Sequence, residues 1–162
     1  GQPMLIVCTQ DPVIRDVATE PGKGIGPWRP AVLLPVGPQA AAREAFAAAL
    51  HELPAGQALC LSAHGNDTEI GDANEGWDWT AAAVANLLEE HAPPGWRGPI
   101  LIHACARTVA QFSGGLAVAL EMRRVFDGLW CYGYNRAVPA DEGFPPPGGL
   151  ARRADLQGTR VG

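Results

Sequence analysis

The segment Ala58–Cys105, ALCLSAHGNDTEIGDANEGWDWTAAAVANLLEEHAPPGWRGPILIHAC, contains a pattern that predicts the fold. It begins with the short apolar run Ala58–Ala63 and ends with a second apolar run, Pro99–Cys105. Between them, Trp79–His91 has a helix-forming composition and apolar residues at a spacing near 3.6. Two buried strands joined through a helix form a right-handed crossover between parallel neighbours. The stretch therefore predicts two adjacent parallel strands.

The same alternation continues on both sides of this stretch. Further apolar runs and helical segments are found at Met4–Gln10, Ala31–Gly37, Gln39–Leu53, Ser113–Phe126 and Gly128–Tyr134. Short continuous apolar runs are typical of strands that are buried on both faces of a sheet. We therefore predict an α/β fold, a three-layer α/β/α domain with a mostly parallel central sheet.

The length and composition fit one domain with its own core. The chain has 162 residues, of which 47% are hydrophobic, and a domain has about 100–200 residues. From residue 139 onward, Pro and Gly cluster and periodicity is weak. We predict a folded domain over residues 1–138 and an irregular tail over residues 139–162.

The charge balance and the cysteines limit the partners and the compartment. Twelve Lys and Arg against 17 Asp and Glu give a net charge of −5, so we expect no nucleic-acid partner. No long apolar run and no signal peptide is evident, so we expect no membrane association and a cytoplasmic location. The cysteines lack paired spacing. We therefore expect no disulfide framework, no metal site, no cofactor, and buried thiols at Cys8, Cys60 and Cys131.

Two of the predicted strands end in residues that can carry chemistry. His64 and Gly65 follow the run Ala58–Ala63, and Cys105 follows the small residue Ala104. Carboxyl ends of parallel strands lie at one edge of the sheet, where α/β folds place their active sites. An imidazole and a thiol at this edge can act as an acid/base partner and a nucleophile.

These residues predict an acyl-transfer mechanism. Cys105 would attack a carbonyl carbon to form a thioester, while His64 would protonate the leaving amine and then activate water. The N–H groups of Gly65 and Cys105 are the expected oxyanion donors. A third group, a carboxylate that orients His64, is compatible with the pattern but is not identifiable from sequence.

The order of these motifs resembles that of the caspase-like cysteine peptidases of clan CD, and most closely the CHAT proteases. The resemblance covers about Ala58 to Tyr134, from the His-Gly strand through the Cys strand to the next strand. It implies a caspase-like fold, a catalytic dyad of His64 and Cys105, a polypeptide substrate and regulation as an effector protease by a protein partner. The flanks of the dyad depart from the CHAT pattern, with Ala63 before the histidine and Ala-Arg-Thr after the cysteine, which bears on the substrate pocket.

Five further residues are predicted to contact the substrate. Asp67 and Trp77 belong to the acidic segment that follows His64, Arg107 lies beside the nucleophile, and Asn135 and Arg136 follow the last apolar run. The acidic segment has three open interpretations: a solvated loop, a rim that favours basic side chains, or a calcium site.

Other functions also remain open on sequence grounds. Cys105 could be a core thiol and His64 a strand-end histidine, which would make the chain an inactive caspase-like scaffold or interaction module. The same dyad also occurs in acyltransferases and deamidases. His103, two residues before Cys105, is expected to have a packing role.

Overall fold

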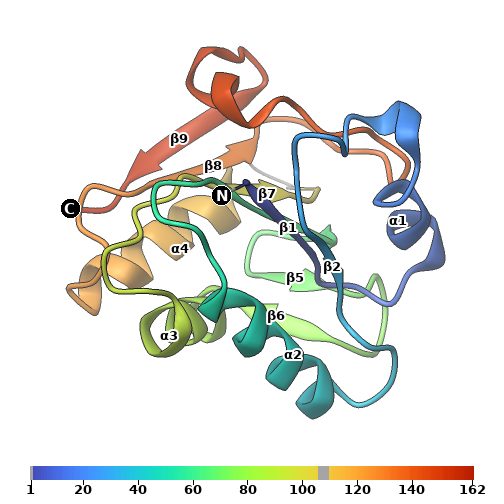
Figure 1. Cartoon of the computed structure of the whole chain (residues 1–162), viewed down its shortest axis with the longest axis horizontal. Helices are drawn as coiled ribbons and strands as arrows, with labels where there is room; N and C mark the ends of the chain where they lie inside the picture. The colour runs from blue at the N-terminus through green and yellow to red at the C-terminus, as the bar shows by residue number, and fades with distance from the viewer. Residues whose placement is uncertain (1, 106–109) are drawn as a thin grey trace.

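A computed structural model describes residues 2–105 and 110–162 and centres on a six-stranded sheet (Figure 1). The strand order is β2-β1-β3-β7-β8-β9. All neighbouring pairs are parallel except β8 and β9, which are antiparallel. The strands are β1 (Met4–Val7), β2 (Ala31–Leu33), β3 (Leu59–Ser62), β7 (Ile100–His103), β8 (Trp130–Tyr134) and β9 (Leu156–Arg160). The predicted α/β fold with a mostly parallel sheet is confirmed.

The register of the three central strands brings their carboxyl ends level. Ser62 at the end of β3 pairs with Val7 of β1 on one side and with His103 of β7 on the other. All the residues of these strands are buried. The segments that follow the three strands therefore leave the sheet at one edge.

Helices cover one face of the sheet, as Figure 1 shows. They are α2 (Gln39–His51), α3 (Ala81–His91) and α4 (Gln111–Met122). The other face is covered by α1 (Pro12–Val17), two short 3-10 turns, η1 (Pro21–Lys23) and η2 (Pro147–Arg152), and the loops around them. Each face has its own cluster of buried apolar side chains, so the arrangement is compatible with three layers.

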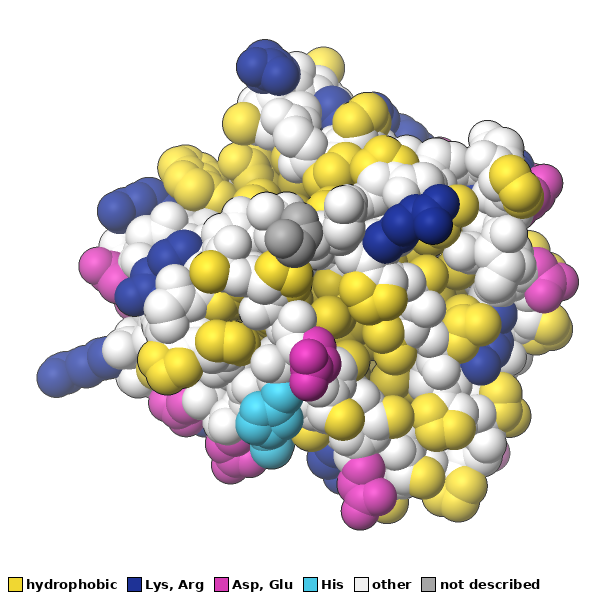
Figure 2. Space-filling model, viewed as in Figure 1, with side chains coloured by type: hydrophobic (Ala, Val, Ile, Leu, Met, Phe, Trp, Pro, Cys, Tyr) yellow, Lys and Arg dark blue, Asp and Glu magenta, His cyan; other side chains and the backbone are white. Residues whose placement is uncertain are grey.

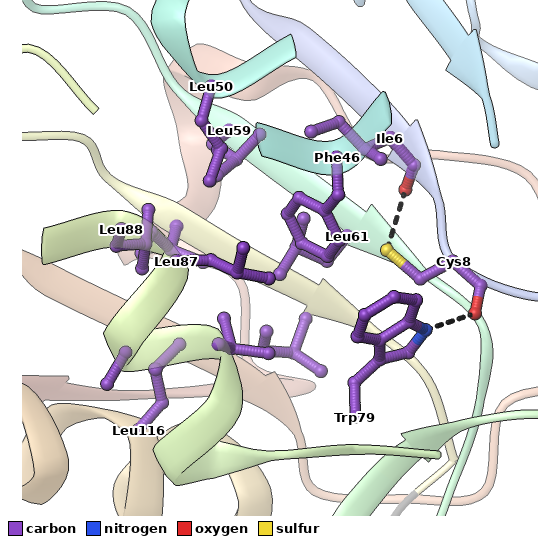
Figure 3. Close-up of a cluster of buried hydrophobic side chains, with 14 of the residues drawn as sticks. Ile6, Cys8, Phe46, Leu50, Leu59, Leu61, Trp79, Leu87, Leu88 and Leu116 are labelled. Atoms are coloured by element: carbon purple, nitrogen blue, oxygen red, sulfur yellow. Dashed lines mark hydrogen bonds between the residues drawn. The ribbon is translucent and has the colours of Figure 1, made fainter. Parts of the chain in front are cut away.

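The cluster beneath the helices includes two of the four cysteines, Cys8 and Cys131, and Figure 3 shows the surroundings of Cys8. Phe46 of α2 meets the ring of Trp79 edge to face, with 5.4 Å between the ring centroids. The Trp79 indole N–H donates to the Cys8 carbonyl oxygen (3.1 Å), and the Cys8 thiol donates to the Ile6 carbonyl oxygen (3.7 Å). Burial raises the pKa of Cys8, as it raises that of Cys131 to about 12. The expected free, buried thiols are confirmed.

A small antiparallel sheet follows β3 and was not predicted. It consists of β4 (His64–Gly65), β5 (Glu69–Gly71) and β6 (Asp78–Thr80). The Asn66 side chain accepts hydrogen bonds from the backbone N–H groups of Thr68 (2.9 Å) and Glu69 (3.0 Å), which closes the turn between β4 and β5. The predicted helix from Trp79 therefore starts later, at Ala81, with Thr80 as the N-cap.

The prediction of an irregular tail over residues 139–162 is wrong for the last part of this range, which forms strand β9. Strand β9 lies at the edge of the main sheet and pairs with β8 from Trp130↔Arg160 to Tyr134↔Leu156. The side chain of Val161 is buried in the core. This segment lacks a run of β-branched residues, and the pairing with β8 fixes its conformation. The folded domain consequently extends past residue 138.

Two surface properties bear on the kind of partner. In the face seen in Figure 2, Lys and Arg side chains are scattered among acidic and apolar ones and form no single patch. Within residues 2–105 and 110–162, no helix is both long enough and apolar enough to cross a bilayer.

Candidate active site

His64 and Cys105 are brought together at the carboxyl edge of the sheet. Both residues line two neighbouring hollows. The first, here called the α1 hollow, is walled by α1, the ends of β3 and β7, and the segment Val138–Phe144. The second, the hairpin hollow, is walled by β4, β5 and the loop that follows. His64 and Cys105 thus share both hollows, at the ends of two neighbouring strands.

The backbone at Gly65 lies against the segment that carries Cys105. A Cβ atom at this position would lie 2.7 Å from the Cys105 carbonyl oxygen and 2.9 Å from the Ala104 Cβ. Such distances exclude any larger side chain, so the close approach requires glycine at 65 and a small residue at 104. The two predicted oxyanion donors, Gly65 and Cys105, therefore belong to adjoining pieces of backbone.

A carboxylate that sequence reasoning did not identify holds His64. The Nε2 atom of His64 lies 2.5 Å from Oδ2 of Asp11. The other carboxylate oxygen of Asp11 accepts from the Val13 backbone N–H (2.8 Å) and caps α1. The hydrogen bond with His64 is the main reason that the pKa of Asp11 is lowered. Because Nε2 faces Asp11, the Nδ1 atom of His64 is the nitrogen left to exchange a proton with the thiol.

Asp72 fixes the segment that carries Asp11. One of its carboxylate oxygens accepts from the Thr9 hydroxyl (2.7 Å) and the Gln10 N–H (2.8 Å). The other accepts from the Gln10 side-chain amide and the Trp77 N–H, each at 2.9 Å. Burial favours the neutral acid, but these hydrogen bonds outweigh it and lower the pKa of Asp72. This member of the acidic segment thus joins the hairpin to the chain after β1.

The predicted substrate contacts on the hairpin side lie in two kinds of environment. Trp77 is buried and lines the hairpin hollow, with its indole N–H donated to the Gly37 carbonyl oxygen (2.8 Å). Asp67 is half-buried in the turn between β4 and β5. Arg107 lies outside the described residues. A wall formed by Trp77 agrees with the geometry, and the contact of Asp67 with substrate stays a prediction.

Asn135 and Arg136 are engaged with the C-terminal part of the chain. The Asn135 side chain donates to the Ala154 carbonyl oxygen (3.0 Å). The Arg136 guanidinium donates to both oxygens of Glu142 (2.8 and 2.7 Å) and to Asp155 (3.0 Å). These bonds hold the segment that walls the α1 hollow. Direct contact of either residue with substrate stays a prediction.

His103 differs from His64 in its surroundings. It is buried, with Nε2 2.9 Å from the Gly143 carbonyl oxygen and Nδ1 3.4 Å from the Ser62 hydroxyl. Because a carbonyl only accepts, Nε2 carries the proton. The ring packs on Phe144, with 4.5 Å between centroids. Burial lowers the pKa of His103, so this residue is neutral and has the expected packing role.

Comparisons with protein-family models, with curated proteins and with solved structures each find no match for this chain.

Proposed function

We propose that this chain is a caspase-like cysteine endopeptidase. The observation that carries the proposal is the shared position of His64 and Cys105 at two hollows, with His64 bound to a carboxylate. Cys105 is half-buried, whereas the other cysteines are buried. A thiol that substrate can reach, next to a histidine held by an acid, is the arrangement that thiol nucleophiles use.

The acylation step follows from the two nitrogens of His64. Nδ1 takes the proton of the Cys105 thiol, and the thiolate attacks the carbonyl carbon of the scissile peptide bond. The carbonyl oxygen becomes an oxyanion, which the N–H groups of Gly65 and Cys105 stabilise. The intermediate collapses as the C–N bond breaks, and the His64 imidazolium gives its proton to the leaving amine. The products are a thioester on Cys105 and a new N-terminus.

The deacylation step uses the same residues in reverse. His64 removes a proton from a water molecule, which attacks the thioester carbonyl carbon. The C–S bond then breaks, and Cys105 leaves as a thiolate that recovers the proton from His64. Asp11 stabilises the imidazolium in both steps and keeps the ring orientation fixed, as an acid does in other triads.

The topology is the second support for a caspase-like assignment. The histidine follows β3 and the cysteine follows β7, and these strands are neighbours with a helix, α3, in the crossover. This is the order that the resemblance to the CHAT proteases requires. The substrate proposed is a polypeptide, and regulation by a protein partner is part of the same proposal.

The test is mass spectrometry of a peptide-library digest. We expect backbone cuts by the unmodified protein, none by Cys105→Ala or His64→Ala, and unchanged cutting by His91→Ala. His91 is the last residue of α3, away from the hollows, so it controls for the loss of a histidine.

The alternatives give different products. A mass increase of about one dalton without a cut would indicate a deamidase, and an acyl adduct would indicate an acyltransferase. No product, together with equal alkylation of Cys105 by iodoacetamide in the unmodified protein and in His64→Ala, would indicate an inactive scaffold.

A further inference from the structure

The α1 hollow is built mainly from apolar side chains. Helix α1 contributes Ile14 and Val17, and the segment after β8 contributes Val138, Ala140 and Phe144. Three of these, Ile14, Val17 and Phe144, belong to the buried cluster on this face of the sheet. The hollow reaches His64 and Cys105, so a side chain inside it would belong to a residue at the reacting bond.

The polar side chains that line this hollow already have partners inside the protein. Both ring nitrogens of His103 are within hydrogen-bonding distance of Ser62 and of the Gly143 carbonyl oxygen. Both oxygens of Glu142 accept from the Arg136 guanidinium, at 2.8 and 2.7 Å. Among the described residues, every ionic group that lines the pocket is thus already paired with an opposite charge. A charged side chain entering it would lose its hydration without gaining an ionic partner.

The two hollows also differ in size. The cavity volume is about 20 Å³ for the α1 hollow and about 410 Å³ for the hairpin hollow. The α1 hollow thus has room for a group little larger than a water molecule. The acylated residue stays attached to Cys105 through the thioester, whereas the leaving segment must depart before water can attack. The smaller, more enclosed hollow therefore suits the residue on the acyl side of the bond, and the larger one suits a segment that passes through.

We infer that the α1 hollow selects a small, uncharged side chain, such as that of Ala or Ser, on the residue whose carbonyl carbon Cys105 attacks. This inference rests on the proposed peptidase function and specifies its substrate. Val138 is the specificity-determining residue that can be varied most safely, because it is half-buried on a loop. Phe144 packs on His103 and is part of the buried cluster, so changing it would disturb the fold.

The test uses peptidyl acyloxymethyl ketones that are identical except for the residue next to the reactive ketone. The rate of covalent labelling of Cys105 is measured by intact-protein mass spectrometry for probes with Ala, Leu, Phe, Arg and Asp at this position. We expect the Ala probe to react at least tenfold faster than the Arg, Asp and Phe probes. Iodoacetamide, which needs no pocket, measures the intrinsic reactivity of the thiol in parallel.

A matched pair of variants locates the selectivity. Val138→Ala enlarges the hollow and should raise the rate of the Leu probe relative to the Ala probe at least threefold. Val118→Ala, at an exposed position on α4, should leave this ratio unchanged. An equal change in both variants would overturn the assignment of Val138.

The outcomes separate this inference from the proposed function. Fastest labelling by the Arg, Asp or Phe probe would overturn the inference and leave the peptidase intact. Reaction of Cys105 with iodoacetamide but with none of the peptide probes would overturn both.

Discussion

Two histidines stand at the same edge of the sheet, and their partners differ in kind. His64 follows β3, is about a quarter exposed, and contacts the carboxylate of Asp11. His103 ends β7, is 4% exposed, and contacts the carbonyl oxygen of Gly143. Both line the α1 hollow, so position alone does not distinguish them.

The difference shows how the surroundings set the role of a histidine. The Asp11 carboxylate accepts from Nε2 of His64 and leaves Nδ1 of the same ring for the thiol. The buried ring of His103 would have to be charged in an apolar environment, and burial lowers its pKa. In the proposed mechanism, His64 is therefore the residue that exchanges a proton with Cys105, and His103 is a neutral hydrogen-bond donor.

Removing the charge on Asp11 should have the largest effect on the activity that we assign to His64. Asp11→Asn keeps a side-chain oxygen that can cap α1, because Asn and Asp are equally good N-caps. It removes the negative charge beside His64. We expect kcat/KM for peptide cleavage to fall by roughly 10²- to 10⁴-fold, since the corresponding change in another triad costs about 10⁴ in kcat. Steady-state kinetics measures the effect, with urea unfolding to check that the variant is folded under the assay conditions.

Asp11→Ala serves as the control for this prediction. It removes the charge and the cap, so it should lose about 1 kcal/mol of stability in addition to the loss of activity. If Asp11→Asn cleaved peptides as fast as the unmodified protein, Asp11 would be a helix cap only, and the two histidines would be less different than the geometry indicates.

The pH dependence of stability under acidic conditions should also differ between the unmodified protein and Asp11→Asn. The pKa of Asp11 is lowered on folding, chiefly by the hydrogen bond with His64. A lowered pKa contributes stability that is present above the unfolded value of 3.8 and is lost as the pH falls through the folded value. The unmodified protein should therefore lose more stability than Asp11→Asn as the pH falls below about 4. Urea unfolding at a series of pH values measures this, and equal losses would contradict it.

The sequence predicted the positions of His64 and Cys105 because the apolar pattern and the strand connection both determine them. Apolar runs and a helix of the right length placed His64 and Cys105 at one edge, and the structure agrees. Asp11 could not be identified because it lies 53 residues from His64, and only the pairing of β1 with β3 brings them together. Asp-Pro at positions 11 and 12 indicates the start of a helix, which the structure shows, but it does not indicate the contact of Asp11 with His64. Strand β9 was missed because its pairing with β8, and not its own composition, determines its conformation.

A smaller effect is expected from changing His103. His103→Phe keeps a ring of similar size but removes the donor to the Gly143 carbonyl oxygen. We expect the free energy of unfolding to fall by about 1–3 kcal/mol, the usual cost of an unsatisfied buried group. The pH profile of cleavage by the folded fraction should be unchanged, because His64 and Asp11 are intact. A shifted profile would show that His103 takes part in proton transfer.

His103 also predicts a pH dependence of stability. Its folded pKa is below the unfolded value of 6.5, so its contribution is fully present above 6.5 and is lost as the pH falls from there through the folded value. Glu142 and Arg136 are the charged groups that act on it, with opposite signs. Between about pH 7 and 5, the unmodified protein should lose stability that His103→Phe does not lose. Parallel slopes in urea unfolding would contradict this assignment.

The smallest effect concerns the hydroxyl of Ser62. Its oxygen lies 3.4 Å from Nδ1 of His103, which is long for a hydrogen bond. The other nitrogen of His103 keeps its bond with Gly143. Ser62→Ala should therefore lower the free energy of unfolding by no more than about 1 kcal/mol and leave kcat/KM within twofold. Urea unfolding and steady-state kinetics test both parts. A loss as large as that of His103→Phe would show that the hydroxyl, and not the carbonyl, supplies the main hydrogen bond of His103.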